Sequence, residues 1–96
     1  MDRDDIISSL RTFKVRHGDH YGIISLGVFG SVARGDIHDD SDVDIYVTTR
    51  TPDPFALVHI KDDLEKSLNR HVDVVRLREK MNPFLKRRIE KEGIRV

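Results

Sequence analysis

Residues 21–48 read YGIISLGVFGSVARGDIHDDSDVDIYVT, and the pattern of this stretch decides the expected fold. Its first part, residues 21–29, is short, apolar and partly β-branched, which predicts a buried strand. Two glycines bracket residues 30–35, where we expect a tight turn or a single turn of helix. After a polar loop at residues 36–41, residues 43–48 alternate in polarity and favour a second strand.

Helices and one more strand are expected on either side of this stretch. Residues 2–16 repeat apolar side chains at helical spacing with aspartates in the first turn, and Gly18 is expected to end that helix. Residues 54–69 predict a second helix and residues 72–75 a third strand. Residues 82–93 start with Asn-Pro, a helix start, and end with glycine. The expected apolar sides are Ile6, Ile7, Leu10 and Phe13 in the first helix, Leu57, Ile60, Leu64 and Leu68 in the second, and Phe84, Leu85 and Ile89 in the last. This order of elements indicates an α/β protein.

The length and composition limit the class of protein. A chain of 96 residues fits a single domain spanning residues 1–96, and with 38% hydrophobic and 35% charged residues its core must be modest. The absence of cysteine excludes disulfides, thiolate zinc sites and cysteine nucleophiles. The N-terminal segment does not have the pattern of a signal peptide, and no apolar run approaches the roughly 20 residues that span a bilayer. We therefore expect a soluble, cytoplasmic protein.

The charges cancel overall but are unevenly distributed. A formal net charge of zero argues against a general nucleic-acid binder that relies on a basic field. Aspartates crowd residues 36–44, whereas Lys and Arg enrich residues 76–95. The simplest interpretation of the basic segment is a solvated helix face; the alternative is a surface that meets an acidic partner, a triphosphate or nucleic acid.

Asp42 and Asp44 are the first candidates for chemistry. Residues two apart in a strand point to the same face, so these carboxylates lie side by side while Val43 and Ile45 face the core. Neighbouring carboxylates repel each other, and a divalent cation relieves that repulsion. Mg²⁺ prefers oxygen ligands and uses one or two carboxylates together with phosphates and water. The pair is therefore a candidate Mg²⁺ site.

Two further features strengthen this interpretation. Gly30-Ser31 directly follows a buried strand, where glycine lets the backbone approach a phosphate and Ser31 adds a hydroxyl donor. Asp73 sits in the apolar run of residues 72–75, where burying a charge is costly. If that strand lies beside the Asp42/Asp44 strand, Asp73 completes a triad of carboxylates; otherwise it is a strand-end residue in solvent.

The combined pattern is similar to the nucleotidyltransferase signature of the DNA polymerase beta superfamily. Gly30-Ser31, ten intervening residues and Asp42-Val43-Asp44 are followed by a single aspartate on a later strand. Residues 29–35 and 41–45 resemble the minimal nucleotidyltransferase antitoxins in particular, as does the C-terminal Ile94-Arg95-Val96. The resemblance covers nearly the whole chain. It implies the polymerase beta-like fold, a small mixed β-sheet with helices packed on it.

The resemblance also implies roles for individual residues. In that family the Gly-Ser turn holds the β- and γ-phosphates, which assigns Gly30 and Ser31 to ATP. Asp42 and Asp44 match the Mg²⁺ ligands, and Asp73 matches the third acid of the metal site, which helps to activate the attacking hydroxyl. Arg34 lies just past the turn, where it either contacts phosphate or pairs with the aspartate-rich loop.

The partner is implied by the resemblance alone. Minimal nucleotidyltransferases are commonly encoded with a HEPN-domain toxin, a helical ribonuclease, and transfer AMP from ATP to a toxin tyrosine. Two alternatives stay open: an antitoxin that acts by binding alone, and nucleotidyl transfer to a small molecule or an RNA 3′ end. Direct binding of nucleic acid and membrane association are not expected, and a domain with a decayed site is the weakest hypothesis.

Histidines and tyrosines are expected to have structural roles. The five histidines are scattered without metal-ligand pairing and are expected in loops or on the surface, with only His38 near the site. Tyr21 and Tyr46 are expected in the core or in strands rather than as acceptors of a nucleotide, although self-modification at Tyr46 is an alternative.

Overall fold

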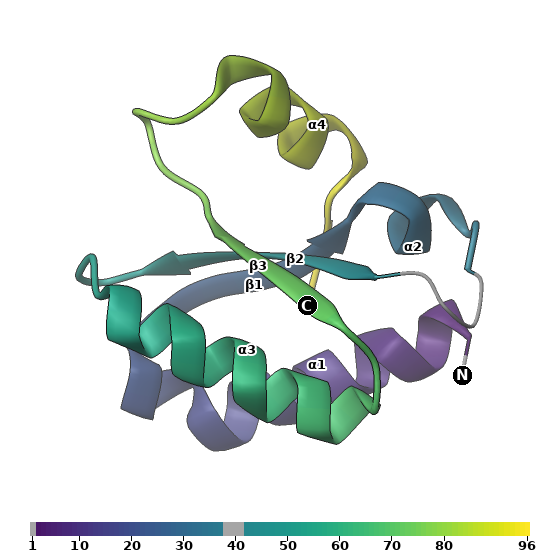
Figure 1. Cartoon of the computed structure of the whole chain (residues 1–96), viewed down its shortest axis with the longest axis horizontal. Coiled ribbons are helices and arrows are strands. Elements are labelled where there is room, and N and C mark those ends of the chain that lie inside the picture. The colour runs from purple at the N-terminus through teal and green to yellow at the C-terminus, as the bar shows by residue number, and fades with distance from the viewer. Residues whose placement is uncertain (1, 38–41) are drawn as a thin grey trace.

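The computed structural model of the chain describes residues 2–37 and 42–96 and has the expected α/β architecture (Figure 1). His38, Asp39, Asp40 and Ser41, which include a minor site candidate and part of the polar loop, lie outside the described residues. The elements are α1 (Arg3–Tyr21), β1 (Ile23–Phe29), α2 (Gly30–Arg34), β2 (Val43–Thr49), α3 (Pro54–Leu68), β3 (Val72–Arg76), α4 (Pro83–Glu92) and β4 (Ile94–Arg95).

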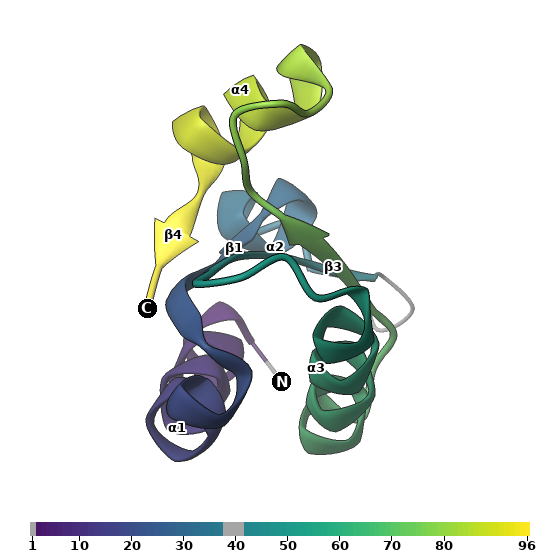
Figure 2. The same cartoon turned by 90° about the vertical axis from the view of Figure 1, so that its left-hand side faces the viewer.

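The strands form a four-stranded mixed sheet in the order β3-β2-β1-β4. β1 pairs antiparallel with both β2 and β4, whereas β2 and β3 are parallel and are joined by the crossover helix α3. Helices α1 and α3 lie together below the sheet, and α2 and α4 lie on its other side (Figure 2). The sheet therefore has one face covered by two long helices and a second face, called here the site face, that only the two shorter helices approach.

The main core lies between the sheet and the two long helices. Alternation along β2 sends Val43, Ile45 and Val47 into this core, all with 0% exposure, as the strand pattern predicts. The helical stripes supply the opposite side with Ile6, Leu10 and Phe13 from α1 and Ile60, Leu64 and Leu68 from α3. Strong burial on this face leaves the intervening residues of β2 and β3 directed at the site face.

A second, smaller cluster fixes α4 on the site face. It consists of Phe29, Tyr46 and Ile89, each less than a tenth exposed, with Val75, Leu77, Met81 and Leu85 packed around them. The Tyr46 ring occupies the space that a Cβ on Gly27 would need, and it lies 3.0 Å from where a Cβ on Gly93 would be. Glycine at position 27 thus lets β1 and β2 close around the ring, and glycine at position 93 leaves room for both the ring and the carbonyl of Ile89. Tyr46 is a core residue, as predicted.

Helix α1 is longer than the sequence pattern predicts. It runs through Gly18 to Tyr21 and ends at Gly22, whose φ of 67° is left-handed, so the predicted stop at Gly18 and strand start at Tyr21 are wrong. The ring of His17 packs on Phe13 and also contacts Tyr21, at i, i+4 spacing, and the Tyr21 hydroxyl donates to Asp63 of α3. These contacts outweigh the low helix propensity of one glycine.

The last helix starts as predicted, and Leu85 and Ile89 of its predicted apolar side pack in the second cluster. Asn82 caps α4 by accepting from the N–H groups of Phe84 and Leu85, with Pro83 at the first helical position. Phe84, expected on the apolar side, is 72% exposed, because α4 is anchored through Ile89 instead. Within residues 2–37 and 42–96, none of the helices has the length and apolar character needed to cross a bilayer.

Gly27→Ala tests the packing around Tyr46. The new methyl group collides with the Tyr46 ring and the carbonyl of Ile94, so we expect a loss of about 1–3 kcal/mol in the free energy of unfolding, measured by urea denaturation. Gly18→Ala is the matched control. Its Cβ meets only Lys14 Cγ at 3.8 Å inside α1, so the variant should gain about 0.5–1 kcal/mol. Equal midpoints for Gly27→Ala and the unmodified protein would contradict this packing.

Candidate active site

The parallel pairing of β2 and β3 brings two aspartates together. Asp44 and Asp73 are direct partners in the register, so their side chains leave the same face of neighbouring strands. Neighbouring strands lie about 4.8 Å apart, so the two carboxylates are close enough to repel each other electrostatically. Asp73 is exposed on the site face rather than buried in the apolar run around it. The conditional expectation that its strand lies beside that of Asp44 is met.

The electrostatics of Asp44 reflect this arrangement. Burial is the largest cause that raises the pKa of Asp44 above its ordinary value of 3.8, and repulsion from Asp73 and Asp42 adds to it. Asp42 is exposed and directly precedes β2, two residues before Asp44. The positive charges of Arg88 and Arg34 act in the opposite direction. A concentration of carboxylate charge is therefore centred on Asp44.

The glycine turn packs directly against that carboxylate. Phe29, the last residue of β1, is the register partner of Asp44, and Gly30 follows it with a φ of 72°. A Cβ on Gly30 would collide with Oδ2 of Asp44, so only glycine allows the turn and the carboxylate to approach so closely. Ser31 lies in the first turn of α2, a helix whose start receives no side-chain cap. Backbone N–H groups at such a start suit an anion.

Arg34 pairs with the aspartate-rich segment, which is one of its two expected roles, and it also contacts α4. It forms an ion pair with Asp36 at 3.9 Å, which is part of the aspartate-rich segment, and a closer one with Glu92 of α4 at 3.1 Å. The second contact ties α2 to the end of α4. A phosphate contact by Arg34 stays a prediction.

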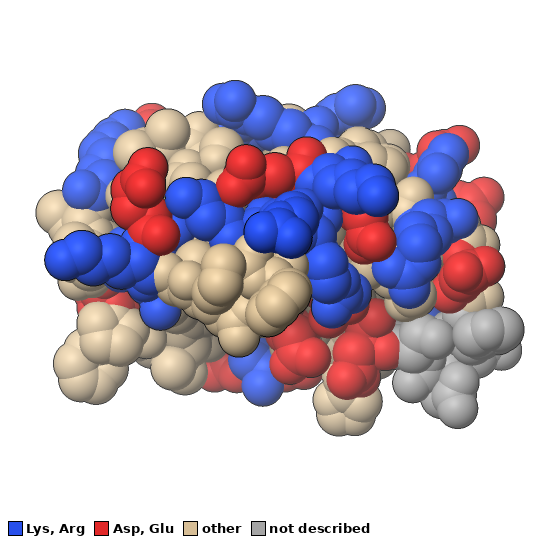
Figure 3. Space-filling view, turned by 90° about the horizontal axis from the view of Figure 1, so that it is seen from above, with Lys and Arg blue, Asp and Glu red and all other residues tan. Residues whose placement is uncertain are grey.

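Sequence reasoning missed Arg88 as part of this region. Its guanidinium carbon lies 5.9 Å from the centroid of the Phe29 ring, next to the strand position of Asp44. The only signal in the sequence is its membership of the basic segment, which contains eight Lys and Arg against three Glu from residue 76 to residue 95. Figure 3 looks onto the side of α4 and shows basic side chains spread across it with acidic ones among them.

The aspartate carboxylates suit a Mg²⁺ ion that is coordinated partly by the protein and partly by the phosphates of a substrate. Among the described residues, no group of three or more acidic or histidine side chains could hold a metal ion by itself. Mg²⁺ usually takes one or two protein carboxylates and completes its octahedron with phosphate and water. The raised pKa of Asp44, caused partly by repulsion from Asp73 and Asp42, is the behaviour of a carboxylate group that a cation would relieve.

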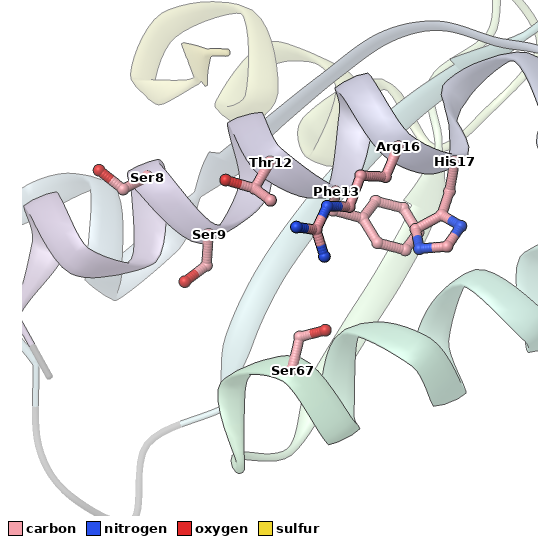
Figure 4. Close-up of a pocket in the computed structure, with 7 residues that line it drawn as sticks. All are labelled: Ser8, Ser9, Thr12, Phe13, Arg16, His17 and Ser67. Atoms are coloured by element: carbon pink, nitrogen blue, oxygen red, sulfur yellow. The ribbon is translucent and has the colours of Figure 1, made fainter.

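The remaining candidates are the histidines of the described residues, and one pocket lies on the opposite side of the sheet. His17, His20, His59 and His71 are exposed, as predicted, and His71 lies 3.5 Å from Glu65. A pocket of about 270 Å³ lies between α1 and α3, the helices on the opposite side of the sheet (Figure 4). It is lined by Ser8, Ser9, Thr12, Phe13, Arg16, His17 and Ser67. No carboxylate lines this pocket, so it does not offer a Mg²⁺ site.

Comparison with known proteins identifies the family. The model of the nucleotidyltransferase domain family matches residues 10–96. The chain belongs to the nucleotidyltransferase family. Adenylyltransferase MJ1379 of Methanocaldococcus jannaschii, a candidate protein adenylyltransferase, is 34% identical over 95 residues, which cover 96% of this chain and 95% of the relative. Protein adenylyltransferase MntA of Thermococcus cleftensis is 36% identical over 73 residues, 75% of this chain and 74% of that protein.

Solved structures agree with this membership. A candidate minimal nucleotidyltransferase superposes with a TM-score of 0.80 at 30% identity, with 98% of this chain and 95% of the other covered. A toxin–antitoxin protein solved with AMP-PNP superposes with a TM-score of 0.73 at 27% identity, with 99% and 72% covered. The nucleotidyltransferase fold predicted from the Gly-Ser and Asp-x-Asp pattern is thereby confirmed.

Gly30→Ala tests the close approach between the turn and Asp44. The methyl group displaces the Asp44 carboxylate, so we expect Mg²⁺-dependent binding of AMP-PNP to weaken roughly 10–100-fold in a calorimetric titration. Gly35→Ala is the control, because Gly35 also has a positive φ, 85°, but faces open space. It should lose about 1 kcal/mol of stability and bind AMP-PNP like the unmodified nucleotidyltransferase. Equal effects of the two variants on binding would contradict the proposed contact.

Asp44→Asn tests the charge repulsion. Because the pKa of Asp44 is raised, the folded protein keeps this proton to higher pH than the unfolded chain does, and ionisation of Asp44 lowers stability as pH rises above about 4. The variant should therefore melt at higher temperature than the unmodified protein at pH 7 in EDTA, and the difference should shrink towards pH 4. Asp62→Asn, at an exposed position of α3, serves as control and should show no such pH-dependent gain.

Proposed function

We propose that this chain is a Mg²⁺-dependent protein adenylyltransferase that transfers AMP from ATP to a tyrosine of a HEPN-domain toxin, with residues 1–96 acting as one domain. The observation that carries this proposal is the meeting of Gly30, Asp44 and Asp73 at one place on the site face. A phosphate-binding turn beside paired carboxylates suits a reaction at a nucleotide phosphate. Relatives named as protein adenylyltransferases support a protein acceptor.

Each site residue has a role in this proposal. The backbone of Gly30 and the hydroxyl of Ser31 hold the β- and γ-phosphates, and Arg34 assists if it releases Glu92. Asp42, Asp44 and Asp73 provide the carboxylate oxygens for Mg²⁺, which supplies neutralisation of phosphate charge when bound. Asp73, the exposed register partner of Asp44, accepts the proton of the attacking hydroxyl. The hydroxyl oxygen bonds to the α-phosphorus, the bond from that phosphorus to the β-phosphate bridge breaks, and pyrophosphate leaves.

The identity of the acceptor rests on the relatives and on the openness of the site. A structural relative of 27% identity is a toxin–antitoxin protein solved with AMP-PNP. Asp42 and Asp73 are both exposed, so a macromolecular hydroxyl has access to them. Tyr46 is 7% exposed and enclosed by the α4 cluster, which disfavours self-modification at that residue.

The test is mass spectrometry of the partner encoded beside this protein. The partner is incubated with ATP, Mg²⁺ and the unmodified protein, the Asp42→Ala/Asp44→Ala variant, or Asp62→Ala as a carboxylate control on α3. We expect AMP-sized mass increases on a partner tyrosine with the unmodified and Asp62→Ala proteins and none with the double variant.

Other outcomes separate the alternatives. An unmodified partner in a stable complex, inhibited equally by the double variant, would replace the proposal with an antitoxin that acts by binding alone. An unmodified partner and no complex would favour a small-molecule or RNA 3′-end acceptor.

A further inference from the structure

Arg88 reaches the site face from α4. Its guanidinium carbon lies 5.9 Å from the Phe29 ring centroid. Phe29 is the strand partner of Asp44 and is followed directly by Gly30-Ser31. The guanidinium is therefore positioned over the junction between the phosphate-binding turn and the strand that carries the aspartates.

The position of Arg88 is fixed by its neighbour in the helix. Ile89, the next residue, is 3% exposed and packs with Phe29 and Tyr46 in the cluster that holds α4 to the sheet. Arg88 itself is exposed. The backbone of Arg88 is thus held by buried packing while its charged end stays accessible to a ligand, an arrangement that limits the entropy lost on binding.

Two glutamates in this part of the chain are paired with other basic residues. Glu92, one helical turn after Arg88, forms its ion pair with Arg34 at 3.1 Å. Lys86 pairs with Glu79 at 3.6 Å, and Arg87 lies over the exposed ring of Phe84. Within residues 2–37 and 42–96, Arg88 forms no ion pair closer than 4.0 Å. Its charge nevertheless lowers the pKa of Asp44 against the effect of burial, which agrees with its placement beside the site.

We propose that Arg88 binds the phosphate chain of the nucleoside triphosphate, so that α4 completes the anion site begun by Gly30 and Ser31. This inference rests on the proposed function and adds a specificity-determining residue to it. A guanidinium presents a planar fork of donors that matches two phosphate oxygens at once. Beside three aspartates, the guanidinium would add positive charge to that of the Mg²⁺ ion around the triphosphate. Arg88 discriminates triphosphates from nucleotides that carry a single phosphate.

The experiment measures nucleotide binding without any acceptor. AMP-PNP and AMP are titrated calorimetrically into the unmodified protein, Arg88→Ala, Arg88→Lys and Arg87→Ala at saturating Mg²⁺. We expect Arg88→Ala to weaken AMP-PNP binding about tenfold or more and AMP binding by a clearly smaller factor. Arg88→Lys keeps the positive charge but lacks the planar guanidinium, so its affinity for AMP-PNP should lie between those of the unmodified protein and Arg88→Ala. Arg87→Ala, at the neighbouring residue whose guanidinium lies over Phe84 instead of Phe29, should bind like the unmodified protein.

The outcomes distinguish this inference from the proposed function. If the unmodified protein binds AMP-PNP and Arg88→Ala binds it equally well, the role of Arg88 is wrong and the proposed function stands. Equal weakening by Arg87→Ala, or equal weakening of AMP and AMP-PNP, would mean a general effect of α4 and would also overturn the inference. Absence of AMP-PNP binding by the unmodified protein would reject both. If Arg88→Ala does not fold, Arg88→Lys and Arg88→Gln provide the same comparison.

Discussion

The close placement of carboxylates on neighbouring strands is the constraint on which the site face depends. Asp44 and Asp73 are register partners across the parallel β2–β3 pair; burial is the largest cause of the raised pKa of Asp44, and repulsion from Asp73 adds to it. The fold tolerates it because the alternate residues of β2 are fully buried in the main core. Core packing on one face thus holds the carboxylate charges together on the other face, where the proposed function places a Mg²⁺ ion that would neutralise them.

The absence of a side chain at two glycines is as important to the site face as the charged groups. Gly30 leaves room for the carboxylate of Asp44, and Gly27 leaves room for the ring of Tyr46. The contact between Gly30 and Asp44 joins the glycine turn to β2. The contact between Gly27 and Tyr46 lets α4 pack on the sheet. This packing places Arg88 over Phe29 and Glu92 beside Arg34. The site is therefore built from three chain segments that small residues allow to converge.

Local patterns predicted most of the fold and the centre of the site. Strand alternation correctly separated Asp44 from Val43 and Ile45, and Asn82-Pro83 correctly marked the start of α4. The pattern failed where tertiary contacts decide: α1 continues through Gly18 because ring contacts hold its last turn. The register that places Asp73 opposite Asp44 and the docking of α4 on Tyr46 depend on residues far apart in sequence. For that reason no local signal distinguished Arg88 from Arg87 or predicted the exposure of Phe84.

The most direct test of the central claim is a crystal structure of the protein with AMP-PNP and Mn²⁺, which substitutes for Mg²⁺ and is located by its anomalous scattering. The account predicts an anomalous peak against Asp44 and at least one of Asp42 and Asp73, with the phosphate chain along Gly30 and Ser31. Nucleotide bound elsewhere, for example in the pocket between α1 and α3, or a peak away from Asp44 would contradict it.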